Sequence, residues 1–266
     1  MTVRVAISNQ KGGVGKSTIT LQTAYYASEK GLKVLVVDMD GQGNTSTKIA
    51  GREAIENIPT NTTLSVDMFK PENQIEEITV LKGSYGIDLI PARINDDLLY
   101  AQEAAPIETI VNPSANLERI ADNYDLIIID CPPSLGRLLS AGLIMADKII
   151  MPIQVSGFAV DGVGGLFKVV EQLQDIGKED LEVAGILINS FNARSKQHHQ
   201  AVKALREKVG DLVMDTIIAN RSPIDQATNQ AKPIWEIRTG AARLARAELT
   251  DAIKEIFKRI GIKYEQ

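Results

Sequence analysis

The chain has 266 residues, of which 44% are hydrophobic and 24% are charged, and its net charge is −5. This composition is typical of a folded globular protein and excludes the collagen-like, disordered and low-complexity classes. The single cysteine, Cys131, excludes a disulfide framework or a cysteine-ligated metal site within one chain. No apolar run reaches the roughly 18–20 residues of a membrane-spanning helix, so we expect a cytoplasmic protein.

Charge is unevenly distributed along the chain. Residues 1–193 contain 15 Lys and Arg against 25 Asp and Glu, whereas residues 194–266 contain 14 against 9. An acidic body with a basic last quarter indicates a local surface for a polyanion, unless the excess only reflects the charged faces of surface helices.

Short β-branched runs alternate with longer segments of helical periodicity. Several runs are continuously apolar, as expected of strands buried on both faces of a parallel sheet. We predict strands at Val3–Ser8, Lys33–Asp38, Ile87–Pro91, Leu126–Asp130, Lys148–Ile153, Val183–Asn189 and Asp215–Ala219. We predict helices at Lys16–Lys30, Asn116–Asn123, Leu135–Met145, Val160–Ile176, His198–Lys208 and from about Gly240 to Ile260.

This alternation, with short connections, predicts an α/β fold in which a doubly wound, mostly parallel sheet is flanked by helices. No Pro-, Gly- or Ser-rich linker divides the chain, so we predict one domain over residues 1–266. Residues 50–79 have the weakest periodicity and are expected to form an insertion with one or two short helices. The basic residues 194–266 are expected to belong to the same domain, with the apolar stripe of the last helix packed on its body.

A glycine-rich loop follows the first predicted strand directly. It reads Asn9-Gln10-Lys11-Gly12-Gly13-Val14-Gly15-Lys16-Ser17-Thr18 and leads into the first predicted helix. Strand, glycine-rich loop, Gly-Lys-Ser and helix form the context of a phosphate-binding loop, in which backbone N–H groups and the helix N-terminus bind phosphate oxygens. Lys16 would supply a point charge to the β- and γ-phosphates, and the Ser17 hydroxyl can ligate Mg²⁺.

The loop departs from the usual pattern at its start. Gln10 stands where the first glycine is expected, and a second lysine, Lys11, follows it. Lys11 is awkward to explain within one subunit, because Lys16 already serves the phosphates. One explanation is that Lys11 reaches a phosphate held by another subunit.

The segment Lys11–Thr18 resembles the deviant Walker A motif of the ParA/MinD family of ATPases, whose first lysine crosses the interface of an ATP-sandwich dimer. Residues 36–44 resemble the switch I segment of this family, with Gly41 in place of the usual proline. Residues 127–136 resemble its Walker B and switch II segment, and residues 218–234 resemble the C-terminal signature of partition proteins. The resemblance covers nearly the whole chain.

This resemblance implies a P-loop NTPase fold of the deviant Walker A class, with ATP and Mg²⁺ as ligands and slow intrinsic ATP hydrolysis. Lys11 and Lys16 would be catalytic, and the residues around the nucleotide phosphates would be Lys11, Gly12, Gly13, Val14, Gly15, Lys16, Ser17 and Thr18.

Three aspartates, Asp38, Asp40 and Asp130, lie at or just after the ends of predicted strands. Ligands of open α/β sheets bind at that edge, and paired carboxylates can serve a hydrated Mg²⁺ and an attacking water. By resemblance, Asp40 would orient or activate the water, while Asp38 and Asp130, together with Ser17, would hold the Mg²⁺, the aspartates through water. Structural capping is the alternative for each aspartate.

Asn189 ends another predicted strand. An amide both donates and accepts hydrogen bonds, which matches the edge of an adenine base, and the resemblance implies that role. A turn-forming asparagine is the alternative.

The basic residues of the last quarter form the candidate DNA surface. Partition ATPases of this family bind DNA without sequence preference, as ATP dimers, and doubling a weak patch would let an acidic protein hold DNA. The candidate residues are Arg194, Lys196, Lys203, Arg206, Arg221, Arg243 and Arg246.

We therefore expect a ParA-type partition ATPase that forms a homodimer with ATP, binds nucleoid DNA and is reset when a ParB-type partner stimulates hydrolysis. Its cargo would be plasmid or chromosomal DNA, and no stable membrane association is expected. The alternatives are a MinD-like membrane-associated ATPase, another cargo-positioning ATPase, or a nucleotide-binding module without useful turnover.

Overall fold

The protein is described by a computed structural model that covers residues 2–155 and 159–264, apart from the side chains of residues 159–162. Within this part, the strands form one sheet in the order β3-β4-β2-β5-β1-β6-β7-β8. Neighbouring strands run parallel except β3, which pairs antiparallel with β4. The strands are β1 (Val3–Ile7), β2 (Val34–Asp38), β3 (Leu81–Lys82), β4 (Asp88–Ile90), β5 (Leu126–Asp130), β6 (Lys148–Gln154), β7 (Glu182–Phe191) and β8 (Val213–Ala219).

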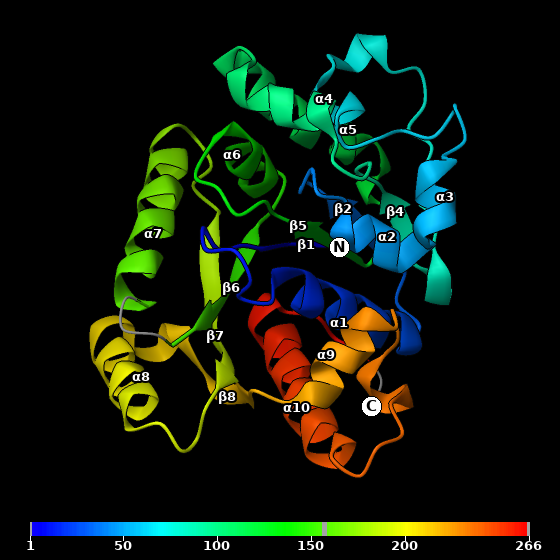
Figure 1. Cartoon of the computed structure of the whole chain (residues 1–266). Helices are drawn as coiled ribbons and strands as arrows, with labels where there is room; N and C mark the ends of the chain where they lie inside the picture. The colour runs from blue at the N-terminus through cyan, green and yellow to red at the C-terminus, as the bar shows by residue number, and fades with distance from the viewer. Residues whose placement is uncertain (1, 156–158, 265–266) are drawn as a thin grey trace.

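Helices cover both faces of the sheet (Figure 1), which confirms the predicted doubly wound α/β class. Apolar side chains of α5 to α8 pack in one cluster, and those of α1, α2, α3, α9 and α10 pack in a second cluster on the opposite face. The helices are α1 (Lys16–Glu29), α2 (Asn44–Ala50), α3 (Arg52–Glu56), α4 (Asp97–Tyr100), α5 (Asn112–Ala121), α6 (Arg137–Ile144), α7 (Ala159–Asp175), α8 (Lys196–Val209), α9 (Ser222–Asn229) and α10 (Ala242–Ile260).

The apolar stripe of α10 is part of the core, as predicted. Leu249, Ile253, Ile256 and Phe257 are fully buried, and they pack on the same face of the sheet as α1. In the part of the chain that the structure describes, no helix is long and apolar enough to cross a membrane.

The elements that the sequence analysis did not predict are short. α2 and α9 span seven and eight residues, and β3 spans two. α9 contains Ser, Asp, Thr and Asn, which are weak helix formers, and it is held in place because Pro223, Ile224 and Ala227 are buried, the last two in the second cluster. Residues 50–79 contain α3 and two single 3₁₀ turns, Asp67–Phe69 and Glu72–Gln74.

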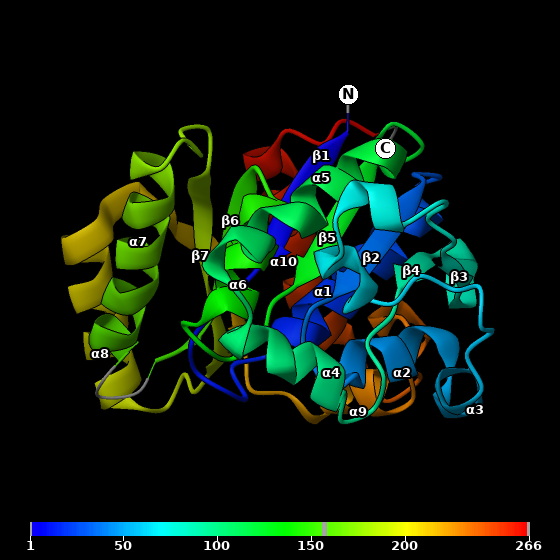
Figure 2. The same cartoon turned by 90° about the horizontal axis from the view of Figure 1, so that it is seen from above.

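All parallel strands end at the same edge of the sheet, and the loops that leave this edge carry the predicted site. The phosphate loop follows β1, Asp40 follows β2, and the loop before α6 follows β5. In Figure 2 this edge is the lower side, where α2 and α4 also lie.

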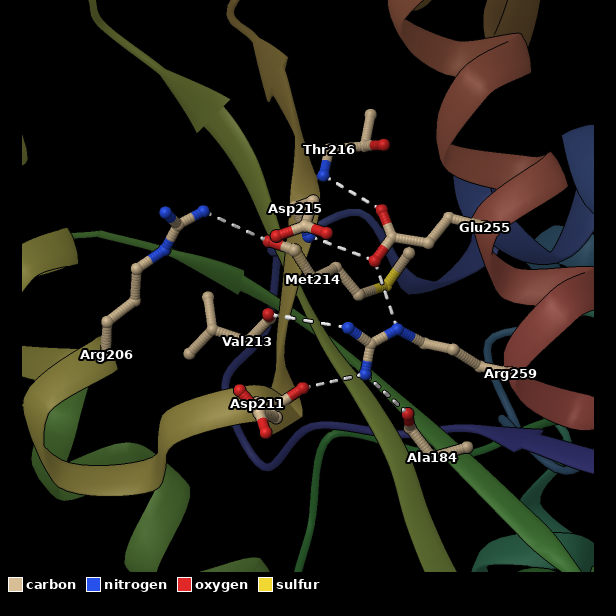
Figure 3. A network of polar contacts seen from close by, with 9 residues as sticks. All are labelled: Ala184, Arg206, Asp211, Val213, Met214, Asp215, Thr216, Glu255 and Arg259. Atoms are coloured by element: carbon tan, nitrogen blue, oxygen red, sulfur yellow. Dashed lines mark hydrogen bonds and ion pairs between the residues drawn. The ribbon is translucent and has the colours of Figure 1, made fainter.

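One of the two outer strands of the sheet, β8, is held by side chains of α10 (Figure 3). The Glu255 carboxylate accepts hydrogen bonds from the backbone N–H groups of Asp215 and Thr216, at 2.9 and 2.8 Å. Consecutive N–H groups reach one carboxylate where the register between β7 and β8 shifts. Arg259 binds Glu255 at 3.0 Å and donates to the carbonyl groups of Ala184, Asp211 and Val213.

The contacts of Glu255 and Arg259 with β8 lead to a prediction about stability. Although burial by itself raises the pKa of Glu255, the hydrogen bonds from Thr216, Asp215 and Arg259 outweigh it and lower that pKa. We expect Glu255→Ala to reduce the free energy of unfolding by about 1–3 kcal/mol at pH 7, because it leaves two strand N–H groups and Arg259 without their acceptor. The loss should shrink as the pH falls below about 4, since a group with a lowered pKa contributes only while it is ionised.

Urea denaturation at pH 7 and at low pH measures both effects. Asp251→Ala on the same helix is the control, because its ion pair with Lys254 is long, at 3.9 Å, and exposed. We expect a change of no more than about 0.5 kcal/mol for this control. Equal losses in the two variants would show that Glu255 does not stabilise β8.

Candidate nucleotide site

The phosphate loop is held from behind by side chains of the neighbouring strands. Gln154 Nε2 donates to the carbonyl of Gly13, and Asn189 Nδ2 donates to the carbonyl of Val14, each at 2.8 Å. The C=O and N–H groups of a trans peptide point in opposite directions. The N–H groups that follow these two carbonyls therefore point away from Gln154 and Asn189 and remain oriented for another acceptor.

The glycines of the loop lie in two different kinds of surroundings. Gly15 has φ +98°, and a Cβ there would lie 2.2 Å from Asn189 Nδ2, so only glycine fits. A Cβ added at Gly12 or Gly13 would meet no atom within 4 Å beyond its chain neighbours, so the front of the loop is open. A loop that is tight behind and open in front fits a bound phosphate group.

The first turn of α1 brings a cation and a hydroxyl to this loop. Lys16 is only 7% exposed, and its charge partly offsets the rise in the pKa of Asp130 that burial causes. The Ser17 hydroxyl donates to Asp130 Oδ2 at 2.9 Å. Thr18, the last residue of the motif, lies against α9, where its hydroxyl is 3.2 Å from that of Thr228. The structure thus brings Lys16, Ser17 and Asp130 together, as the sequence analysis expected.

Two buried carboxylates face each other across neighbouring strands. Asp38 of β2 is in register with Asp130 of β5, and both are almost fully buried. Asp130 accepts hydrogen bonds from the hydroxyl groups of Ser17, Thr20 and Thr45. Asp38 accepts from the N–H and the hydroxyl of Ser46, at 2.8 and 2.7 Å.

These hydrogen bonds do not fully compensate the buried charge. Burial and the neighbouring Asp130 raise the pKa of Asp38 to about 8, and burial raises the pKa of Asp130 to about 6. A divalent cation would favour the ionised form of both groups. Among the described residues, no three His, Cys, Asp or Glu side chains form a metal cluster. The donor set therefore fits Mg²⁺ held by Ser17, by water on the carboxylates and by phosphate oxygens.

Asp40 lies closer to solvent than the other two aspartates. It is half-buried, its Oδ1 accepts from the Gln42 N–H at 3.1 Å, and its own N–H donates to Asp38 Oδ1 at 3.2 Å. Its backbone is thus fixed to Asp38 while part of its carboxylate remains accessible. This position fits the water-orienting role that the resemblance implies, which stays a prediction.

Asn189 has a contact that the sequence analysis did not expect. Its amide is buried and already donates to the phosphate loop, so the structure shows a loop-holding role. Contact with adenine stays a prediction. Gln154 has the same loop-holding role and was missed as a site residue, although it also ends a strand at this edge, and that position was the available signal. No comparable local signal marks Thr45 or Ser46.

The candidate DNA residues divide into two groups. Arg221 forms an ion pair with Glu248 at 2.5 Å, which raises the pKa of Arg221, and Arg246 donates to the Ile237 carbonyl. Both are therefore engaged inside the protein. The exposed side chains are Arg194, Lys196, Lys203, Arg206 and Arg243. Of these, Arg206 also donates to the Met214 carbonyl at 3.4 Å, and Lys203 forms an ion pair with Glu207 at 3.8 Å.

The buried carboxylate pair generates a pH prediction for the protein without divalent cations. Because the pKa of Asp38 is raised on folding, the folded chain holds a proton that the unfolded chain releases, and the free energy of unfolding falls as the pH rises from about 4 to about 8. Asp38→Asn removes this charge. We expect the variant to be more stable than the natural chain by on the order of 1–3 kcal/mol at pH 8, and the gain to be smaller at pH 5.

Denaturation with urea in the presence of a chelator measures this difference, and Asp38→Ala serves as the comparison because it also removes the acceptor of Ser46. If Asp38→Asn were less stable than the natural chain at pH 8, the inferred cost of ionising the buried Asp38 would be contradicted.

Comparisons with known proteins identify the family. A protein-family model described as an AAA domain matches residues 2–183. The chain is 32% identical over 234 residues to the sporulation initiation inhibitor protein Soj of Bacillus subtilis, covering 86% of this chain and 89% of Soj. It is 30% identical over 232 residues to the chromosome partitioning protein ParA of Caulobacter vibrioides, covering 86% and 85%.

Among solved structures, an ATP complex of McdA from Cyanothece superimposes with a TM-score of 0.83 over 100% of this chain and 98% of that one, at 22% identity. This likeness concerns the fold. The matched family model, the two relatives and the phosphate-loop geometry agree, and the chain belongs to the ParA/Soj family of partition ATPases.

Proposed function

We propose that this protein is an ATP-dependent DNA-partition ATPase. Mg-ATP drives formation of a sandwich homodimer, the dimer binds DNA without sequence preference, and hydrolysis stimulated by a ParB-type partner resets it. The single observation that carries the proposal is the phosphate loop with Lys16 and the buried pair Asp38 and Asp130 at one edge of the sheet. This arrangement suits a triphosphate with a divalent cation.

The roles of the residues follow from their positions. Backbone N–H groups of the loop and the N-terminus of α1 bind phosphate oxygens. Lys16 adds a positive charge, and burial strengthens the attraction between this charge and the phosphates. Mg²⁺ would be held by Ser17 and, through water, by Asp38 and Asp130; it would neutralise charge on the phosphates. Asp40 would orient the attacking water from the more exposed side of the site.

Dimerisation rests on Lys11. It lies in the exposed front of the loop beside Gly12 and Gly13, and its N–H donates to Asn9 Oδ1 at 2.8 Å. We propose that its side chain contacts the phosphates bound by the partner subunit. Two subunits facing each other through this edge would each complete the site of the other.

The position of the basic residues supports DNA binding in the dimer. Arg194 and Lys196 follow the end of β7. Arg243 lies in the first turn of α10, and Glu248 of the same helix accepts hydrogen bonds from the Ala219 N–H and from Arg221 at the end of β8. Both positions are therefore near the edge that carries the phosphate loop, so closing two subunits there would bring two basic surfaces together. A membrane-associated function receives no such support, because the apolar face of α10 is used in the core.

Nucleoid association, a ParB-type partner, and a plasmid or chromosomal cargo belong to this proposal and are supported by the partition proteins that the chain resembles.

Two substitutions should separate ATP binding from ATP hydrolysis. Lys16→Ala removes the buried charge next to the phosphates, and we expect it to abolish ATP binding. Asp40→Ala should bind ATP with near-normal affinity, accumulate as a dimer and hydrolyse at least about 100-fold more slowly, because a group that positions water matters only for the chemical step. Calorimetry, light scattering and steady-state hydrolysis are the measurements. Near-normal affinity in Lys16→Ala would refute the site assignment.

DNA binding should depend on ATP and on the exposed basic residues. For two patches of two or three phosphate contacts each, log K should fall against log salt with a slope of about −4 to −5. Replacing Arg194 and Lys196 together by Glu should abolish binding while ATP-dependent dimerisation survives. The matched control replaces Lys33 and Lys263 together by Glu, which makes the same change of charge at two exposed lysines that precede β2 and follow α10. It should retain DNA binding.

Fluorescence anisotropy with unrelated DNA duplexes, with ATP and with ADP, gives the result. Equal binding by the two double variants would remove the support for this DNA surface, and binding to anionic liposomes instead would favour a membrane-associated function.

A further inference from the structure

The segment formed by α4 and the following 3₁₀ turn, Ala101–Ala104, lies at the same edge of the sheet as the proposed ATP site. It is firmly anchored. Leu99 is fully buried in the first apolar cluster, and the buried Asp96 side chain accepts from the Leu99 N–H at 3.0 Å. The Asp96 N–H donates to the carbonyl of Gly41 at 2.7 Å. The segment is therefore a fixed part of the fold that touches the loop after β2.

Tyr100 makes a second and closer contact with that loop. A Cβ added at the buried Gly41 would lie 2.8–2.9 Å from three atoms of the Tyr100 ring, so the ring occupies the space of a side chain at position 41. Gly41 directly follows Asp40. Burial and the neighbouring Asp40 raise the pKa of the Tyr100 hydroxyl, which agrees with a ring placed beside this carboxylate.

Glu103, one turn further, contacts the loop that follows β5. Its carboxylate accepts from the backbone N–H of Arg137 at 2.6 Å and from the Ser134 hydroxyl at 3.3 Å. A Cβ at Gly136 would lie 2.0 Å from this carboxylate. The loop between Asp130 and α6 is thus packed against Glu103 as tightly as Gly41 is packed against Tyr100.

We infer that Tyr100 and Glu103 are positioning residues that form a bridge between the loop carrying Asp40 and the loop following Asp130. The inference rests on the proposed ATPase function, because Asp40 and Asp130 are its water- and magnesium-positioning groups. Catalytic groups must keep their relative positions within a fraction of an ångström. Pairing of β2 with β5, continued by the hydrogen bond from the Met39 N–H to the Asp130 carbonyl at 2.9 Å, connects the two strand ends, and the loops beyond them are joined by a further contact. The bridge provides that contact from outside the nucleotide site.

Steady-state ATP hydrolysis tests the bridge through Gly41, because this glycine and Tyr100 compete for one space. Gly41→Ala in the natural chain should lower kcat by about tenfold or more and leave KM for ATP within about twofold, since the added methyl displaces Asp40 and not the phosphate loop. In the Tyr100→Ala background the space is vacant, and Gly41→Ala should cause no further loss.

Three further variants separate positioning from general damage. Tyr100→Phe keeps the ring and should retain kcat within about twofold, whereas Tyr100→Ala and Glu103→Ala should each lower kcat with little change in KM. Gln102→Ala is the matched control, because its side chain bonds within the segment, to the Leu98 carbonyl at 3.3 Å. It should behave like the natural chain.

The outcomes decide the inference in either direction. Equal loss from Gly41→Ala in both backgrounds, loss through KM alone, or full activity of Tyr100→Ala would each overturn it. Absence of ATP hydrolysis by the natural chain, with DNA and partner present, would instead refute the proposed function. In that case urea denaturation of the natural chain, Gly41→Ala, Tyr100→Ala and the double variant decides. Changes in the free energy of unfolding that are not additive support the bridge, and additive changes overturn it.

Discussion

The site depends on two carboxylates that the fold buries side by side. Asp38 and Asp130 end adjacent parallel strands in register, where burial opposes their ionisation and each raises the electrostatic cost of the other. Such a pair is stable only with donors around it, and the chain provides them from two helices. Ser17 and Thr20 come from α1, and Thr45 and Ser46 come from α2. The first turns of both helices are therefore tied to the strand ends.

This arrangement links stability to function. Hydroxyl and amide donors stabilise the carboxylates only in part, and the remaining negative charge is what favours a cation at this edge of the sheet. Lys16 contributes a positive charge without filling the space in front of the open glycines of the phosphate loop. A fully neutralised site would be more stable and would have less affinity for magnesium and phosphate.

The loops around the carboxylates also make close contacts between their backbone and side chains from other parts of the chain. Gly15 lies against Asn189, Gly41 against Tyr100 and Gly136 against Glu103. At each of these glycines a single methyl group would collide with an atom from a distant part of the chain. The backbone of the site is thus determined from outside, by residues that need not touch the nucleotide.

The sequence by itself determined the parts of this protein that depend on local chemistry. β-branched apolar runs predicted the strands of the parallel sheet to within about two residues, because burial on both faces requires continuous apolar residues. The glycine-rich loop and the aspartates at strand ends were predicted to lie together, as they do, since parallel strands all end at one edge, while their roles stay predictions. Short elements such as α2 and α9 were missed, because their few weak helix formers are held by tertiary packing.

Only the tertiary structure decided which distant residues meet. Asn189 reaches Val14 across 175 positions, Thr45 reaches Asp130 across 85, and the ion pair of Arg221 with Glu248 takes one candidate DNA residue off the exposed surface. No spacing in the sequence marks such pairs. They depend on the order of strands in the sheet and on the face that each helix covers, which follow from the packing of the whole chain and not from any one segment of it.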